Sequence, residues 1–241
     1  MKSDLKSKHL QTVLQTVISF ILEHPLIITA ALFALYIISF SMIESSVPES
    51  VFLIDLGIDH IIPFSKYASF LYCTWHIELL AIILVYRFCT DKRSYWLFTG
   101  KILLGMFAIL LICLIFPSEV ALRPESVEGT DAFASLTRLV YSMDNCQNVF
   151  PSGHAFASVI MAQGWCRLSD RKWKSAFWIS LNSGIILSTF LLKQHSVVDA
   201  IGGIILAAIV NIVSEYVAGY LEDMERKKKL KTRPVLRIRG F

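Results

Sequence analysis

Long apolar runs separated by short polar stretches make up most of this chain of 241 residues. The amino-terminal segment differs, because between residues 10 and 22 apolar side chains recur three or four positions apart while glutamine and threonine occupy the other face. That spacing predicts an amphipathic helix that lies in the plane of a membrane interface. The pattern ends at Glu23-His24-Pro25, where the longer apolar runs begin.

Six apolar runs follow this break, and a run of about 18 or more apolar residues is long enough to cross a bilayer. The predicted fold is therefore all-α, a polytopic membrane helix bundle with six transmembrane helices. The predicted spans are residues 25–43, 66–88, 96–116, 152–168, 176–193 and 196–217. The chain then divides into an interfacial amphipathic helix (1–24), a six-span membrane domain (25–217) and a basic tail (218–241).

Composition supports a membrane protein and fixes its expected orientation. Hydrophobic residues make up 55% of the chain and charged residues only 17%, whereas a soluble domain carries about a quarter charged residues. Lysine and arginine are concentrated in four segments: the amino terminus, the loop between the second and third spans, the loop between the fourth and fifth spans, and the tail. With six spans these segments share one side, and such an excess marks the cytoplasmic side.

Both termini are therefore predicted to be cytoplasmic, and the cell (plasma) membrane is the expected location. The basic tail either binds anionic membrane lipids or only fixes the topology, and no nucleic acid partner is expected. Of the five cysteines only Cys146 lies in a long polar loop, so no disulfide framework is implied. Because that loop is predicted to be outside, we expect an impermeant thiol reagent to label Cys146 from outside.

Two histidines lie at the outer ends of predicted spans. His154 begins the fourth span, and His195 begins the sixth together with Asp199. The 41 residues between the histidines hold two crossings of about 18–20 residues each. Both imidazoles are therefore expected at the same membrane face, and Arg123, just after the third span, is expected there too.

The spacing of His195 and Asp199 puts them four residues apart on one helix face, where they can form a hydrogen bond. A carboxylate on one imidazole nitrogen fixes the tautomer and leaves the other nitrogen as a nucleophile or base. The run from Ser196 to Asp199 also fits a capping box, and the two roles are compatible. Deeper in the second span, His76 and Glu78 are expected to form an interhelical hydrogen bond.

The turn before His154 is suited to binding an anion. Ser152 can cap the fourth span, and Gly153 permits close approach of a ligand to the backbone. The free N–H groups of the first helical turn attract negative charge. With the planar donors of Arg123 nearby, these residues predict a phosphate site.

These motifs resemble those of the type-2 phosphatidate phosphatase (PAP2) superfamily of integral membrane lipid phosphatases. The middle motif of that family, Pro-Ser-Gly-His, is present unaltered at residues 151–154. The third motif reads Ser-Arg, five residues, His, three residues, Asp, and here Thr189 replaces the arginine. The first motif reads Lys, six residues, Arg-Pro, and here Phe116 replaces the lysine. Lys193 can supply one of the two missing charges.

The resemblance implies a mechanism without metal or cofactor. His195 would attack phosphorus to form a phosphohistidine, and Asp199 would stabilise the imidazolium. His154 would protonate the leaving lipid oxygen and then activate water. The equatorial oxygens would be held by Arg123, Ser152, the Gly153 backbone and Lys193.

Several functions remain open at this point. A lipid phosphatase would act on phosphatidate, phosphatidylglycerophosphate or a polyprenyl diphosphate at the extracytoplasmic face. A lipid phosphotransferase would pass the phosphoryl or head group to an acceptor hydroxyl instead. A non-catalytic lipid-binding membrane protein is a third possibility, and a metal site formed by the two histidines and Asp199 is a fourth. Activity that survives EDTA would exclude the metal site.

Overall fold

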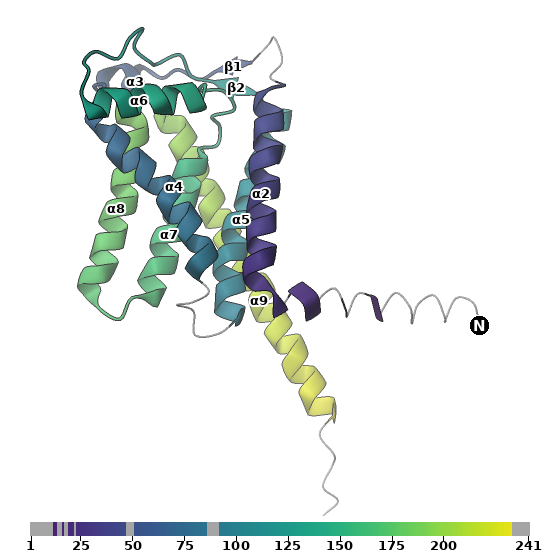
Figure 1. Cartoon of the computed structure of the whole chain (residues 1–241). Coiled ribbons are helices and arrows are strands. Elements are labelled where there is room, and N and C mark those ends of the chain that lie inside the picture. The colour runs from purple at the N-terminus through teal and green to yellow at the C-terminus, as the bar shows by residue number, and fades with distance from the viewer. Residues whose placement is uncertain are drawn as a thin grey trace, which may run out of the picture.

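The structure is a computed structural model that describes residues 12, 13, 16, 19–21, 23–46, 51–85 and 92–232. Within these residues, long helices run side by side and short elements lie across one end (Figure 1). The long helices are α2 (Pro25–Glu44), α4 (Ser69–Leu84), α5 (Lys92–Ile115), α7 (Gly153–Leu168), α8 (Lys172–Leu191) and α9 (Val197–Thr232). The predicted amphipathic segment 10–22 lies largely outside the described residues.

The described part of the chain is mostly helical, which confirms the all-α prediction. Four helical segments in it are long and apolar enough to cross a membrane: Pro25–Glu44, Lys66–Leu84, Lys92–Ile115 and Val197–Met224. Helix α7 is shorter, with 16 residues, and α8 carries Lys172 and Lys174 in its first turn and Asn182 in its middle. That α7 and α8 also cross the membrane, which would make six crossings in all, therefore stays a prediction.

Helix α9 continues well past the predicted end of the sixth span at residue 217 and reaches Thr232. Residues 221–232 are mostly leucine, methionine and charged residues, which favour a helix. The hydropathy falls after residue 217, but the helix propensity stays high, so the helix continues. The first part of the basic tail is thus a continuation of the last long helix (Figure 1). Residues 233–241 lie outside the described part.

The end of the bundle that carries the motifs is covered by short elements, which we call the cap. Strands β1 (Phe52–Leu53) and β2 (Ser118–Glu119) pair in parallel. The other elements of the cap are α3 (Gly57–Ile61), the 3-10 helix η1 (Lys66–Ala68) and α6 (Ala132–Met143). Asp131 caps α6 by accepting hydrogen bonds from the N–H groups of Phe133 and Ala134, both at 3.1 Å.

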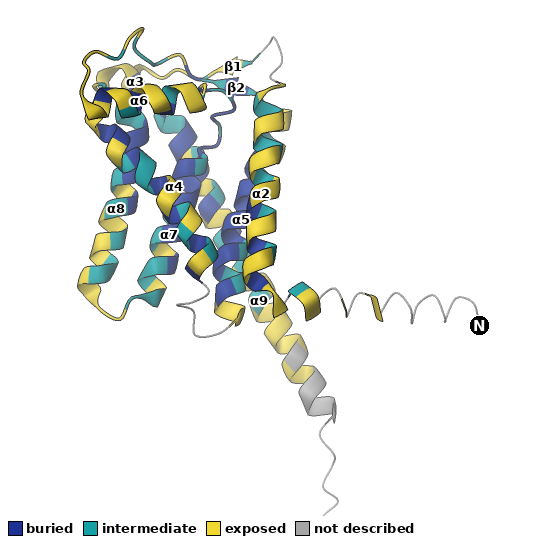
Figure 2. Ribbon diagram, viewed as in Figure 1, coloured by how far each residue is buried: buried dark blue, intermediate teal, exposed yellow. Residues whose placement is uncertain are grey.

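The core lies between α4, α5, α7, α8 and α9, and its buried side chains include Ile102, Met106, Phe156 and Ile185. The outward faces of the long helices instead expose large apolar side chains, such as Leu80 (64% exposed) and Ile212 (71% exposed). Figure 2 shows this contrast along α2 and α9. Apolar side chains on an outer surface are what a lipid environment accommodates.

Candidate active site

Asp199, His195 and His154 form a continuous polar series at the capped end of the bundle. Nδ1 of His195 lies 3.4 Å from Oδ2 of Asp199, and Nε2 of His195 lies 3.4 Å from Nδ1 of His154. All three side chains are buried, with residue exposures of 0%, 7% and 8%. The sequence predicts the two histidines at the same membrane face, and the structure brings them into contact.

Asp199 makes both of the contacts that its position suggested. Its Oδ2 atom also accepts a hydrogen bond of 2.9 Å from the N–H of Ser196, as in the capping box. Its Oδ1 atom is buried and has no hydrogen-bond partner among the described residues. The carboxylate is thus fixed by the start of α9, while its unpaired oxygen leaves capacity to stabilise a charged imidazole.

The Pro-Ser-Gly-His turn is held directly against α9. The N–H of Ser152 donates to the backbone carbonyl of Asp199 at 2.9 Å, and Oγ of Ser152 accepts from the N–H of Ala155 at 3.2 Å. A Cβ atom built on Gly203 would lie only 2.4 Å from the carbonyl oxygen of Ser152. Only glycine at this position of α9 permits so close an approach.

Gly153 has the opposite environment. A Cβ atom built there would meet only the end of Ile109, at 4.0 Å. The protein therefore leaves space beside the first turn of α7, next to the free N–H groups that attract anions. The phosphate site at this turn stays a prediction from the sequence.

Two aromatic residues that the sequence did not single out hold the ring of His154. The ring centroid of His154 lies 4.4 Å from that of Tyr72 and 4.2 Å from that of Trp75, both on α4. The hydroxyl of Tyr72 donates to Oδ2 of Asp144 at 3.1 Å. Nε2 of His154 is buried without a partner among the described residues. The aromatic neighbours therefore fix the orientation of this imidazole.

Arg123 lies beside the site but binds the residue that precedes His195. Its Nε atom donates to Oε1 of Gln194 at 3.1 Å, and its Nη1 atom donates to the carbonyl of Tyr141 at 3.2 Å. The guanidinium also lies over the Tyr141 ring, 4.1 Å from its centroid. These contacts hold the cation in place near His195, and no contact with either histidine is observed.

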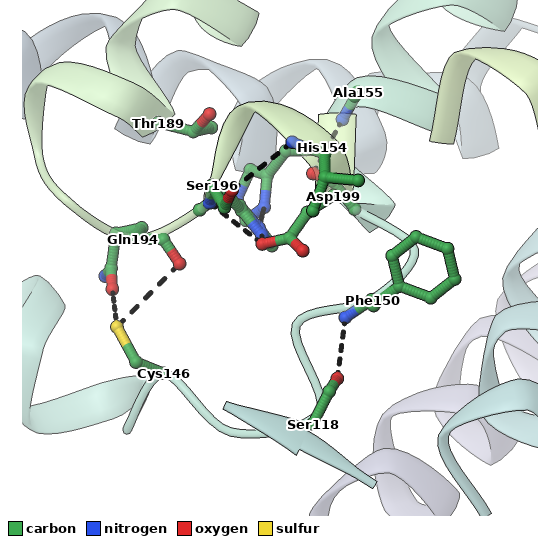
Figure 3. A network of polar contacts seen from close by, with 12 residues as sticks. Ser118, Cys146, Phe150, His154, Ala155, Thr189, Gln194, Ser196 and Asp199 are labelled. Atoms are coloured by element: carbon green, nitrogen blue, oxygen red, sulfur yellow. Dashed lines mark hydrogen bonds and ion pairs between the residues drawn. The ribbon is translucent and has the colours of Figure 1, made fainter. Parts of the chain in front are cut away.

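Cys146 contacts the same amide, with Sγ 2.9 Å from Oε1 of Gln194 (Figure 3). It is only 3% exposed, and burial raises the pKa of its thiol to about 12. A thiol with such a pKa forms almost no reactive thiolate near neutral pH. The expectation that a thiol reagent labels Cys146 is therefore wrong, because a residue in a polar loop of the sequence is packed inside the cap.

Lys193 is directed into the cap. Its ammonium group donates to the carbonyls of Asp59 and Ile62, at the end of α3. These two hydrogen bonds leave one N–H of the ammonium for other partners. The predicted role of Lys193 in phosphate binding therefore depends on that remaining donor.

Asp59 is a residue of the site that the sequence analysis missed. It is 2% exposed, and its carboxylate accepts hydrogen bonds from Oγ of Ser196 at 2.6 Å and from the N–H of Val197 at 2.9 Å. It thus supports the amino terminus of α9 beside Asp199. The one available signal was an acidic residue, next to His60, between the isoleucines of the stretch 57–62.

The positions of the two missing cations are occupied by side chains with other contacts. Phe116 stacks on Phe52 with ring centroids 4.3 Å apart and an interplanar angle of 16°, and it meets Phe150 edge-on. Thr189 is buried and donates from Oγ1 to the carbonyl of Ile186 at 2.8 Å. Neither position therefore provides a charge near the histidines.

The interhelical hydrogen bond expected for His76 and Glu78 is present for one of the two residues. Nδ2 of Asn182 on α8 donates to Oε1 of Glu78 on α4 at 3.4 Å, which confirms the expectation for Glu78. His76 was expected deeper in the span but lies beside the site, with its ring centroid 6.0 Å from that of His154. It also has ring contacts with Tyr72 and Trp75.

Comparison with known proteins shows the family to which the chain belongs. A family model described as the PAP2 superfamily matches residues 52–213, which are 162 of the 241 residues. The match runs from β1 into α9 and contains every candidate site residue named above. No curated protein and no solved structure matches the chain. The match to this superfamily supports phosphatase-type activity, which is the hydrolysis of a phosphoester. The chain therefore belongs to the PAP2 superfamily.

Proposed function

We propose that the protein dephosphorylates a membrane lipid phosphate through a phosphohistidine intermediate, without a metal ion. The observation that carries the proposal is the buried series from Asp199 through His195 to His154. The substrate class is phosphatidate, phosphatidylglycerophosphate or a polyprenyl diphosphate. A membrane chain with several apolar helices meets such lipids in its own environment.

The geometry supports one assignment of the imidazole nitrogens. Because Nδ1 of His195 faces Asp199, its Nε2 is the nucleophile that forms the bond to phosphorus. As the bond between phosphorus and the lipid oxygen breaks, Nδ1 of His154, the nitrogen facing Nε2 of His195, donates a proton to that oxygen. The same nitrogen then takes a proton from water, which attacks phosphorus and releases phosphate from His195.

The developing charge on the phosphoryl oxygens needs donors that are already oriented. The first turn of α7 supplies the backbone N–H of Gly153 beside open space, whereas the N–H of Ser152 is held by the carbonyl of Asp199. Arg123 lies close to Gln194 and adds positive charge to this region. Lys193 adds the remaining N–H of its ammonium.

The distribution of basic residues supports an active site on the extracytoplasmic side. Arg167, Arg171, Lys172 and Lys174 lie at the α7–α8 turn, opposite the cap. Single cysteines at exposed Ser126 in the cap and at exposed Arg171 test this in a chain whose native cysteines are replaced. An impermeant reagent added outside cells is expected to label position 126 and not position 171. The reverse labelling would overturn the orientation.

Phosphate release from a panel of lipid phosphates in EDTA tests the activity. Purified protein is expected to release phosphate from one or more of the three lipid classes, and His195→Ala is expected to abolish it. The matched control is His60→Ala, because His60 is exposed and its one side-chain partner among the described residues is Asp55. Full activity in His195→Ala would contradict the mechanism, and loss of activity in EDTA would favour a metal site.

Transfer to an acceptor hydroxyl is the second candidate. The replacement of two cationic positions by Phe116 and Thr189 favours it, since altered phosphate binding suits a different donor. A labelled donor lipid separates the two reactions. Label that moves to an added alcohol without matching phosphate release would identify a transferase, whereas neither product from any lipid would favour a non-catalytic lipid-binding protein.

A further inference from the structure

A groove lies between α5 and α9 at the end of the bundle opposite the cap. Its volume is about 680 Å³, within the range of small-molecule sites. Its walls include Trp96 and Leu104 from α5 and Val213, Val217 and Leu221 from α9. The four aliphatic side chains in this set, those of Leu104, Val213, Val217 and Leu221, are about half exposed. The groove therefore has an apolar surface that no other described residue covers.

The groove runs along the expected membrane normal. Lys92 and Leu104, at its two ends on α5, are twelve residues apart, which is about 18 Å of helix. On α9, Glu215 follows Val197 by eighteen residues, or about 27 Å, close to the hydrocarbon thickness of about 30 Å. The groove therefore begins at the level of lipid headgroups and ends in the hydrocarbon region of the leaflet opposite the active site.

Charge is distributed along the groove in the same direction. At the headgroup level Lys92 and Arg93 line it, and Arg93 binds Glu222 and donates to the carbonyl of Ala218 at 3.4 Å. Deeper in the groove, Lys101 is 4% exposed and its Nζ binds Glu215 at 2.7 Å.

Arg167 binds the same carboxylate of Glu215 at 3.0 Å. The four cations Lys92, Arg93, Lys101 and Arg167 therefore face two acids, Glu215 and Glu222. The groove and its paired residues keep a surplus of two positive charges.

We propose that this groove binds one anionic phospholipid of the leaflet opposite the active site, with its phosphate at Lys92 and Arg93 and its acyl chain between α5 and α9. An apolar channel with a basic mouth at headgroup depth complements such a lipid. The chain's own tail is excluded as the occupant, because residues 226–239 are strongly basic and would be repelled by the surplus positive charge. This site is independent of the reaction at the histidines.

Native mass spectrometry of the full chain in detergent, titrated with phosphatidylglycerol or phosphatidylcholine, tests the proposal. We expect phosphatidylglycerol to bind in preference, and Lys92→Ala/Arg93→Ala to weaken that binding on the order of tenfold. The matched control is Arg171→Ala/Lys172→Ala, which removes the same two residue types at the same membrane end, outside the groove. Equal weakening by both pairs would overturn the proposal, because it would show attraction by general charge.

A second pair of variants fills the groove without changing charge. Gly100 lines the groove and a Cβ atom there would meet nothing within 4 Å, so Gly100→Leu projects into the space of the acyl chain. Gly219→Leu is the control, since Gly219 is equally open but lies outside the groove. We expect Gly100→Leu to lose bound phosphatidylglycerol and Gly219→Leu to keep it. Retention by Gly100→Leu, or equal binding of phosphatidylcholine, would contradict the proposed site.

Discussion

The two ends of the helix bundle carry charged residues in different settings. At the capped end Asp59, His195 and Asp199 are buried within the protein, and one oxygen of Asp199 has no partner among the described residues. At the opposite end several charged groups are exposed and paired with an opposite charge, as in the bonds of Asp170 with Lys174 and of Arg167 with Glu215. Buried charged groups that are incompletely paired are typical of catalytic sites, whereas exposed ion pairs are typical of the boundary between a membrane and water.

Apart from the loss in His195→Ala, the largest effect is expected at Asp199. Asp199→Asn keeps an oxygen that can accept from the N–H of Ser196 but removes the charge that faces Nδ1 of His195. We expect kcat for lipid phosphate hydrolysis to fall by roughly 10³–10⁴, as for loss of an aspartate that orients a catalytic histidine, with the thermal midpoint nearly unchanged. A fall of less than tenfold would show that Asp199 serves only as a cap, and the contrast between the ends would weaken.

The next effect is expected at Gly203, which lies on α9 and does not touch the reacting atoms. Gly203→Ala puts a methyl group 2.4 Å from the carbonyl of Ser152, so the Pro-Ser-Gly-His turn must move away from α9. Displacement by about 1 Å can cost on the order of 100-fold in rate. Activity measurements beside Gly219→Ala, where a Cβ atom has open space, check this. Equal activity of the two variants would show that the turn tolerates displacement.

A smaller loss of activity is expected at Asp59, which acts on His195 only through the start of α9. Asp59→Ala leaves the hydroxyl of Ser196 and the N–H of Val197 without their acceptor. We expect a loss of roughly 1–3 kcal/mol in stability and a tenfold to hundredfold lower kcat, with KM little changed. Asp59→Asn, which retains an acceptor oxygen, should recover part of both.

Asp55→Ala is the control for Asp59, because Asp55 is an exposed acid of the same cap that binds His60. Unfolding curves and steady-state kinetics on the variants at both positions separate positioning from general destabilisation of the cap. A loss of stability without a change in kcat in Asp59→Ala would limit Asp59 to a structural role.

The residues in these predictions differ in how far the sequence could reveal them. The long helices and the pairing of His195 with Asp199 follow from local rules, namely apolar length and a spacing of four residues on a helix. The contact of Asp59 with Ser196 joins residues 137 positions apart, and no local pattern encodes it. The contacts of Tyr72 and Trp75 with His154 could not be predicted from the sequence either, because aromatic residues on an apolar helix have no distinctive spacing.

The cap was also beyond the reach of hydropathy. Helix α6 and strands β1 and β2 lie in stretches that the pattern assigned to polar loops. Their short apolar segments gain stability only by packing on the ends of the long helices. This explains why Cys146 was expected on the surface and is found inside.

The smallest effect is expected at the end opposite the cap. Oδ1 of Asp170 lies 2.6 Å from Nζ of Lys174, and the hydrogen bond from Lys174 lowers the pKa of this carboxyl. Because the pKa is lower in the folded protein, the pair stabilises the fold above the ordinary aspartate pKa and loses its effect as the pH falls through the folded value. Exposed pairs of this kind contribute little, so Asp170→Asn should leave both kcat and the thermal midpoint at pH 7 almost unchanged. A loss of activity comparable to that of Asp59→Ala would mean that the α7–α8 turn is coupled to the histidines through the length of the bundle, and that the two ends do not act separately.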